Sequence, residues 1–146
     1  MRNITHLVVH CSATPEGKRF TAADIDRWHK ERGWEMIGYH FVILLDGTIE
    51  MGRPISRVGA HVSGYNATTI GICLIGGMDA TGKKAKDTYN EKQLASLHAL
   101  LHDMKAQFPK AEVLGHRDFP NVHKECPSKD IRAWWNGGHK IEGNNG

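Results

Sequence analysis

Short apolar runs of strand length, separated by two helical patterns, constrain the fold of this chain most strongly. The runs are Ile4–His10, Tyr39–Leu45 and Thr69–Ile75, and the second is apolar on both of its alternating faces, as expected of a strand inside a sheet. Between the runs, residues 22–32 and 91–107 carry apolar side chains at helical spacing. Strands mixed with helices predict an α/β domain, with helices packed on both faces of one central, mostly mixed sheet.

Local signals predict where these elements begin and turn. Thr21, followed three residues later by Asp24, is typical of an N-cap, and Asn90 can cap the second helix in the same way. The pair Asp46-Gly47 predicts a hairpin that returns through Thr48–Met51. The remaining expected elements are a short strand at Glu112–Leu114 and a last helix at Asp130–Trp135.

Length and composition indicate one globular domain. The chain has 146 residues, and a domain takes roughly 100–200. We therefore expect one domain over residues 1–136 and a flexible Gly/Asn-rich tail over residues 137–146. The chain is expected to act as a monomer.

Charge and hydropathy exclude several kinds of partner. The net charge is +3 and no basic run is longer than Lys83-Lys84, so we expect no nucleic-acid partner. No apolar run approaches the roughly 18 residues of a membrane span, and the N-terminus lacks the apolar stretch of a secretory signal. These patterns predict a chain that is cytoplasmic as made, with no membrane span.

The cysteines fall into two kinds. There are three, an odd number, which argues against a disulfide framework. Cys11 and Cys73 lie in apolar runs, where cysteine is typically a small buried hydrophobe. Cys126 instead lies among polar residues before Pro127, so it requires a chemical explanation.

Three potential metal ligands lie at or beyond expected strand ends. They are His10, His116 and Cys126. Two imidazoles and one thiolate suit tetrahedral zinc, and a fourth position left for water would make the site catalytic. The spacing is not that of a zinc finger, so the alternative is that each histidine only packs a strand end.

A second interpretation makes Cys126 a nucleophile. Its base would be His116 or His10, and its place just before a helix is typical of reactive cysteines. In either chemistry, Tyr39 and Lys124 could donate hydrogen bonds to a tetrahedral intermediate. The spacing leaves both interpretations open.

These residues occur within four sequence blocks. The blocks are Val9-His10-Cys11-Ser12-Ala13-Thr14; Gly38-Tyr39-His40-Phe41; Val58-Gly59-Ala60-His61 with Gly64-Tyr65-Asn66; and Gly115-His116-Arg117-Asp118 with Lys124-Glu125-Cys126-Pro127. In this order they resemble the type-2 N-acetylmuramoyl-L-alanine amidases, and most closely the small single-domain phage lysins. Animal peptidoglycan recognition proteins share that fold. The resemblance extends over nearly the whole chain.

The resemblance implies a zinc hydrolase of peptidoglycan or muropeptides. It would cut the amide between the lactyl group of N-acetylmuramic acid and L-alanine, with one zinc ion (Zn2+) per chain at one end of the sheet. Carried over residue by residue, it implies His10, His116 and Cys126 as zinc ligands. It also implies that Tyr39 orients or deprotonates the attacking water and that Lys124 stabilises the oxyanion.

The resemblance also implies two positions that contact substrate, and it leaves the identity of the general base open. His61 and Asn66 match positions that would contact substrate. Some relatives use a glutamate as base, and Glu50 and Glu35 are the acidic residues nearest the Tyr39 block.

The sequence also predicts the surroundings of Asp118 and His40. Asp118 either orients a ligand imidazole or caps a turn. His40 should point away from Tyr39 along their strand, as a hydrogen-bonded core residue.

Three biological settings fit such an enzyme. They are a phage or prophage lysin that acts on the wall after release, an injected antibacterial effector, and a recycling enzyme. The alternative to an enzyme is a non-catalytic peptidoglycan-binding module.

Overall fold

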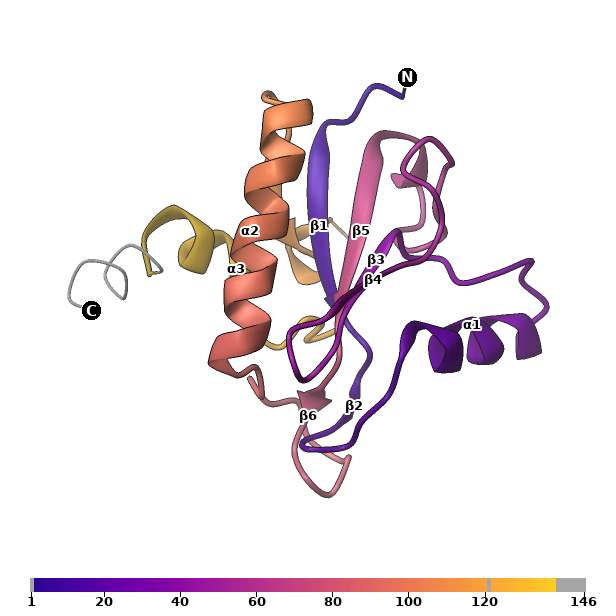
Figure 1. The fold of residues 1–146 in the computed structure, drawn as a ribbon, viewed down its shortest axis with the longest axis vertical. Helices are drawn as coiled ribbons and strands as arrows, with labels where there is room; N and C mark the ends of the chain where they lie inside the picture. The colour runs from indigo at the N-terminus through magenta and orange to yellow at the C-terminus, as the bar shows by residue number, and fades with distance from the viewer. Residues whose placement is uncertain (1, 121, 139–146) are drawn as a thin grey trace.

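A computed structural model describes residues 2–120 and 122–138. Figure 1 shows a central sheet beside the long helix α2, with α1 at the opposite side. The strand order is β4–β3–β5–β1–β7; β1 is parallel to β5 and β7, β3 is parallel to β5, and β4 is antiparallel to β3. The mixed α/β prediction is therefore confirmed. The strands are β1 (His6–Cys11), β3 (Phe41–Ile43), β4 (Ile49–Met51), β5 (Thr69–Leu74) and β7 (Glu112–Gly115).

The two main helices begin where their caps predict. Helix α1 (Ala22–Glu31) begins with a reciprocal capping box between Thr21 and Asp24. Helix α2 (Glu91–Gln107) begins with the same arrangement between Asn90 and Gln93. Such caps satisfy backbone N–H groups that have no partner inside the helix.

The C-terminal elements differ from the prediction. One helix was expected over Asp130–Trp135, but α3 (Ile131–Ala133) continues as the π-helical turn η3 (Trp134–Gly138). The first two residues of the expected flexible tail thus belong to η3, and the rest of that tail lies outside the described residues. In the described part of the chain, no helix is long and apolar enough to cross a membrane.

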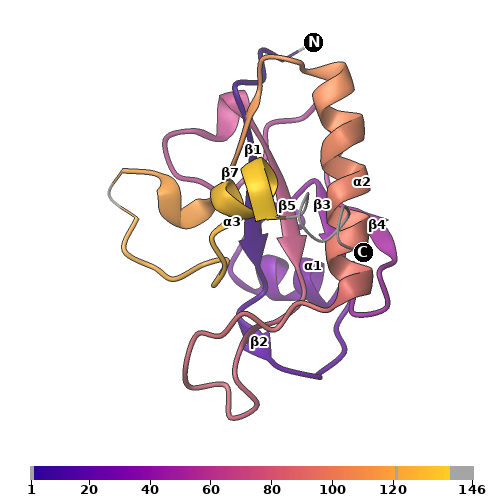
Figure 2. The same cartoon turned by 90° about the vertical axis from the view of Figure 1, so that its left-hand side faces the viewer.

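Side chains of the sheet pack into separate clusters on its two faces. On β1, Leu7, Val9 and Cys11 face α2 and α3, in a cluster that includes Leu97 and Leu101. Figure 2 shows α2 and α3 in front of the sheet and α1 behind it. Side chains alternate along a strand, so His10 lies on the other face, as does its register partner Cys73, which packs in the α1 cluster. Both Cys11 and Cys73 are buried, as predicted.

Strand β3 is shorter than predicted, and this changes the direction of two side chains. The expected strand was Tyr39–Leu45, but β3 begins at Phe41. The prediction that Tyr39 and His40 point to opposite faces is wrong, because strand alternation does not extend that far back. Instead both rings approach His61, with centroids 6.5 Å and 5.8 Å from its ring.

A guanidinium near the N-terminus anchors the loops before β5. Arg2 donates hydrogen bonds to the carbonyl oxygens of Ile55 at 2.9 and 3.1 Å, Asn66 at 3.2 Å and Thr69 at 3.0 Å. The segment between residues 55 and 69, which includes His61 and the 3-10 turn η1 (Asn66–Thr68), is thereby tied to the segment that precedes β1. A second, two-stranded sheet of β2 (Thr14–Pro15) and β6 (Gly77–Met78) was not predicted.

Candidate functional site

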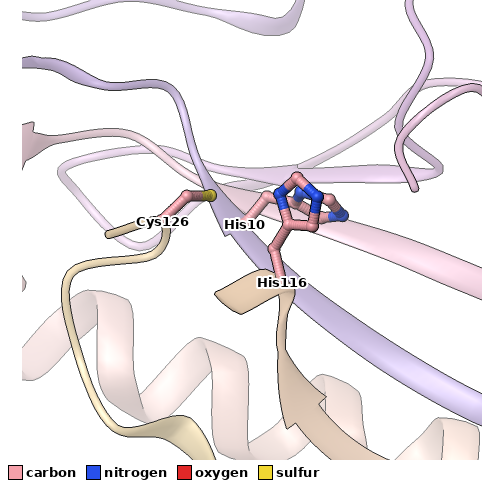
Figure 3. Close-up of side chains that lie close together, drawn as sticks. All are labelled: His10, His116 and Cys126. Carbon is pink, nitrogen blue, oxygen red and sulfur yellow. The ribbon is translucent and has the colours of Figure 1, made fainter. Parts of the chain in front are cut away.

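Three potential ligands converge where β1 and β7 end. His10 is in β1, His116 opens the 3-10 turn η2 (His116–Asp118) directly after β7, and Cys126 lies in the loop before α3. Their nearest ligand atoms all lie within 4.8 Å of one another, and Figure 3 shows the three side chains together. Parallel strands end at the same edge of a sheet, which is why residues more than 100 positions apart meet.

The chemistry of the three donors suits a metal that accepts nitrogen and sulfur, such as zinc. His10 is 1% exposed, and burial lowers the pKa of both His10 and His116 below the ordinary histidine value. A neutral imidazole is the form that binds a metal. The Sγ of Cys126 accepts a hydrogen bond of 3.2 Å from the Cys11 backbone N–H, an interaction that also favours a thiolate.

Cys126 lies close to the buried Cys11. Its interaction with the Cys11 thiol and its burial raise the pKa of Cys126 above the ordinary cysteine value. The backbone N–H of Arg117 donates to the carbonyl oxygen of Cys126 at 2.9 Å, so the loop is held against η2.

Tyr39 and Lys124 lie in the same cavity as the three ligands. This cavity of about 270 Å3 is lined by residues that include His10, Tyr39, His116, Lys124 and Cys126. The Tyr39 ring lies 5.0 Å from that of His10 between centroids. Burial raises the pKa of Tyr39 well above its ordinary value, so its phenol remains a hydrogen-bond donor at neutral pH. After burial, the positive charge of Lys124 is the next cause that lowers the pKa of His116, so the two groups are close.

A second cavity adjoins the first. It measures about 430 Å3, and its lining includes His61, Asn66 and His123. Both cavities share Trp34 and Lys124, among other residues, so they form one groove past the ligands. His61 and Asn66 thus lie where the resemblance implies substrate contact. Sequence reasoning missed His123, although its position next to Lys124 could have suggested it.

His61 is itself bonded to a ligand. Its Nδ1 lies 2.8 Å from the Nε2 of His10, and its Nε2 lies 3.2 Å from the Oγ1 of Thr69. Burial is the main cause that lowers the pKa of His61 to about 3. Asn66 holds the backbone on either side of the ring, because its Oδ1 accepts from the N–H groups of His61 at 2.8 Å and Val62 at 2.9 Å.

The two glutamates considered as bases have other partners. Glu50 accepts a hydrogen bond of 2.8 Å from the Ala22 backbone N–H at the start of α1. Glu35 forms an ion pair with Arg57 at 2.9 Å. Neither lines the groove, which leaves Tyr39 as the residue of that block beside the ligands.

Asp118 and His40 have structural partners. The Oδ2 of Asp118 accepts from the Gly115 backbone N–H at 2.9 Å, so the turn-capping alternative is the one found. His40 is fully buried, and its Nδ1 accepts from the Gly71 N–H at 3.0 Å. Its Nε2 lies 2.8 Å from the Arg57 carbonyl oxygen. The prediction of a hydrogen-bonded core histidine is confirmed.

Comparisons with known proteins agree with this geometry. Residues 1–129 match the family model described as N-acetylmuramoyl-L-alanine amidase. The endolysin of Enterobacteria phage K11 is 41% identical over 138 residues, which cover 94% of this chain and 89% of the phage protein.

Solved structures extend the likeness to the fold. The amidase LysC from Clostridium intestinale superposes with a TM-score of 0.75 at 30% identity, over 99% of this chain and 86% of LysC. A mutant of the Drosophila recognition protein PGRP-LB, in complex with tracheal cytotoxin, gives a TM-score of 0.76 at 27% identity, over 94% and 82% of the two chains.

The family match covers most of the chain, and the phage relative aligns over nearly all of it. The resemblance seen in the four sequence blocks is therefore confirmed. The chain belongs to the N-acetylmuramoyl-L-alanine amidase family.

Proposed function

We propose that this chain is a zinc-dependent amidase of bacterial peptidoglycan. It hydrolyses the amide between the lactyl group of N-acetylmuramic acid and L-alanine. The observation that supports this most strongly is the convergence of two imidazoles and one thiol within 4.8 Å, in a member of this family. Residues 1–136 form the catalytic domain, which acts as a monomer.

His10, His116 and Cys126 are the residues that would hold one zinc ion. Bound there, zinc supplies a Lewis acid that activates water and polarises a carbonyl. The neutral imidazoles favoured by burial and the backbone N–H at the sulfur fit that role. With three protein ligands, one position remains for a reactant, as in catalytic zinc sites.

Two further side chains act directly on the reacting atoms. Tyr39 keeps its proton at the phenol oxygen and donates a hydrogen bond that orients the attacking water. The ammonium of Lys124, at the junction of both cavities, stabilises the negative charge that develops on the carbonyl oxygen. His61 and Asn66 line the groove that receives the substrate.

The relatives favour one biological setting. The phage relatives are endolysins, which supports a phage or prophage lysin that degrades the cell wall after release and is therefore bacteriolytic. The complex of PGRP-LB with tracheal cytotoxin supports a muropeptide as the unit recognised in the groove.

A product assay on a defined muropeptide tests the proposal. Purified protein should release the intact stem peptide from the lactyl sugar, as identified by mass. Activity should disappear after chelation and return with zinc. His10→Ala and Cys126→Ser should lose zinc and activity together, while His102→Ala, an exposed histidine on α2, should lose neither.

Two outcomes would contradict the proposal. Cleavage that survives complete zinc removal would assign the chemistry to Cys126 as nucleophile. Binding of the muropeptide without cleavage, in the presence of zinc, would indicate a recognition module.

A further inference from the structure

We infer that His61 is a positioning residue for the metal ligand His10. A hydrogen-bond chain from Thr69 through His61 fixes the tautomer of His10, so that its Nδ1 carries the lone pair offered to the metal. The inference rests on the proposed metal role of His10, and it assigns His61 a task other than substrate contact.

One end of this series of hydrogen bonds is a backbone carbonyl, which accepts from Thr69. The Oγ1 of Thr69 lies 2.9 Å from the carbonyl oxygen of Tyr65. A carbonyl only accepts, so the single hydroxyl proton of Thr69 is donated there. Towards His61, at 3.2 Å, Oγ1 can therefore only accept. The Nε2 of His61 must carry a proton.

The next step passes through the His61 ring. The ring is packed over Gly71, and among the described residues neither of its nitrogens is bonded to a carboxylate that would hold a second proton. The ring is therefore neutral, with its one proton on Nε2. Its Nδ1 must then accept from His10, whose Nε2 lies 2.8 Å away. The remaining nitrogen of His10, Nδ1, is left with its lone pair.

The ring of His61 has little freedom to leave this position. It lies directly over Gly71 in β5, where a Cβ atom would be 2.6 Å from its Cγ. Only glycine leaves room for the ring at this point. Thr69, at the start of the same strand, is fully buried, so the hydroxyl that bonds to His61 is equally fixed.

This arrangement separates positioning from substrate contact. Both nitrogens of His61 are already bonded to protein atoms, so the ring has no unused polar atom for a ligand in the groove. Ligand histidines commonly donate their second N–H to a carboxylate or a carbonyl, and removing that partner weakens metal binding about 10- to 100-fold. Here a neutral histidine takes the place of the carboxylate.

Zinc affinity, measured by competition with a chromogenic chelator, provides the first test. His61→Leu should weaken zinc binding about 10- to 100-fold. His61→Asn should recover part of that loss, because its Oδ1 can accept near the position of Nδ1. Thr69→Val should weaken binding less than His61→Leu, and Thr69→Ser should restore it. Thr68→Val is the matched control, since the Thr68 hydroxyl also approaches the Tyr65 carbonyl, at 3.5 Å, but does not bond to His61; it should change nothing.

Nitrogen NMR of the zinc-loaded protein provides a second, independent test. Two-bond proton–nitrogen spectra should show His10 bound to zinc through Nδ1 with Nε2 protonated, and His61 protonated at Nε2 alone. Coordination of His10 through Nε2 would overturn the inference, as would unchanged zinc affinity in His61→Leu. If His61→Leu does not fold, the zinc affinity of Thr69→Val and the nitrogen spectra of the wild type still test the inference. A wild-type protein that binds no zinc would instead refute the proposed function.

Discussion

The buried histidine beside the groove makes the stability of this protein depend on pH. His40 is fully buried, and its Nδ1 accepts from the Gly71 backbone N–H, an interaction that only an unprotonated nitrogen can make. Arg2 and Arg53 add positive charge nearby. Burial is the main cause that lowers its pKa to about 4 in the folded state, against the ordinary value of 6.5.

The size of the effect follows from this difference. A shift of one pKa unit corresponds to about 1.4 kcal/mol, so a shift of about 2.5 units between folded and unfolded states gives about 3 kcal/mol. The folded state favours the neutral imidazole. Its contribution is therefore complete above pH 6.5, where His40 is neutral in both states, and it is lost as the pH falls from 6.5 to about 4.

The assay compares wild type with His40→Asn, whose amide oxygen can accept from the same N–H but does not titrate. Urea unfolding of both proteins, kept metal-free with chelator, gives their free energies of unfolding at pH 7 and pH 4. The difference in free energy of unfolding between the two proteins should change by about 3 kcal/mol from pH 7 to pH 4, because wild type loses more stability on acidification. A difference that stays constant over this range would refute the reasoning.

Four further predictions concern the groove and its supports. Gly71→Ala should destabilise the fold by about 1–3 kcal/mol in urea unfolding and weaken zinc binding in chelator competition, because its Cβ would displace the His61 ring. Gly137→Ala should do neither, because a Cβ there would meet no packed atom of the described residues within 4 Å. Tyr39→Phe should lower kcat about 100-fold or more while zinc content, measured by atomic absorption, stays at one per chain. Lys124→Ala should lower kcat by a similar factor without a loss of zinc, and a change in KM alone would contradict its oxyanion role. Arg2→Ala should cost about 1–3 kcal/mol in thermal or urea unfolding, because several partly buried carbonyl oxygens lose their donor.

The helices and the ligands were predictable because their signals are local. Capping residues determine where α1 and α2 begin, and no distant contact is needed to recognise them. His10 and His116 lie at the ends of apolar strand-like runs, so their convergence follows from a parallel sheet. Cys126 was separable from the other cysteines because polar residues surround it in the sequence.

The features that were missed depend on contacts between distant segments. Strands β2 and β6 have two residues each, too few for any periodicity. The bond between His10 and His61 joins positions 51 residues apart, and no spacing rule predicts it. The expected alternation of Tyr39 and His40 failed because a strand's end depends on its neighbours in the sheet rather than on its own apolar pattern.

The place of β1 in the sheet bears on how the chain is made. It lies between β5 and β7, and His6 pairs with Thr69 on one side and Glu112 on the other. A ribosome adding about 5–20 residues per second completes those partners seconds after β1 has emerged. Until then the apolar side chains of β1 have no sheet to join, so the nascent chain is open to aggregation and to chaperones. The same order means that a product terminated before residue 112 lacks β7, one of the two neighbours of β1 in the central sheet.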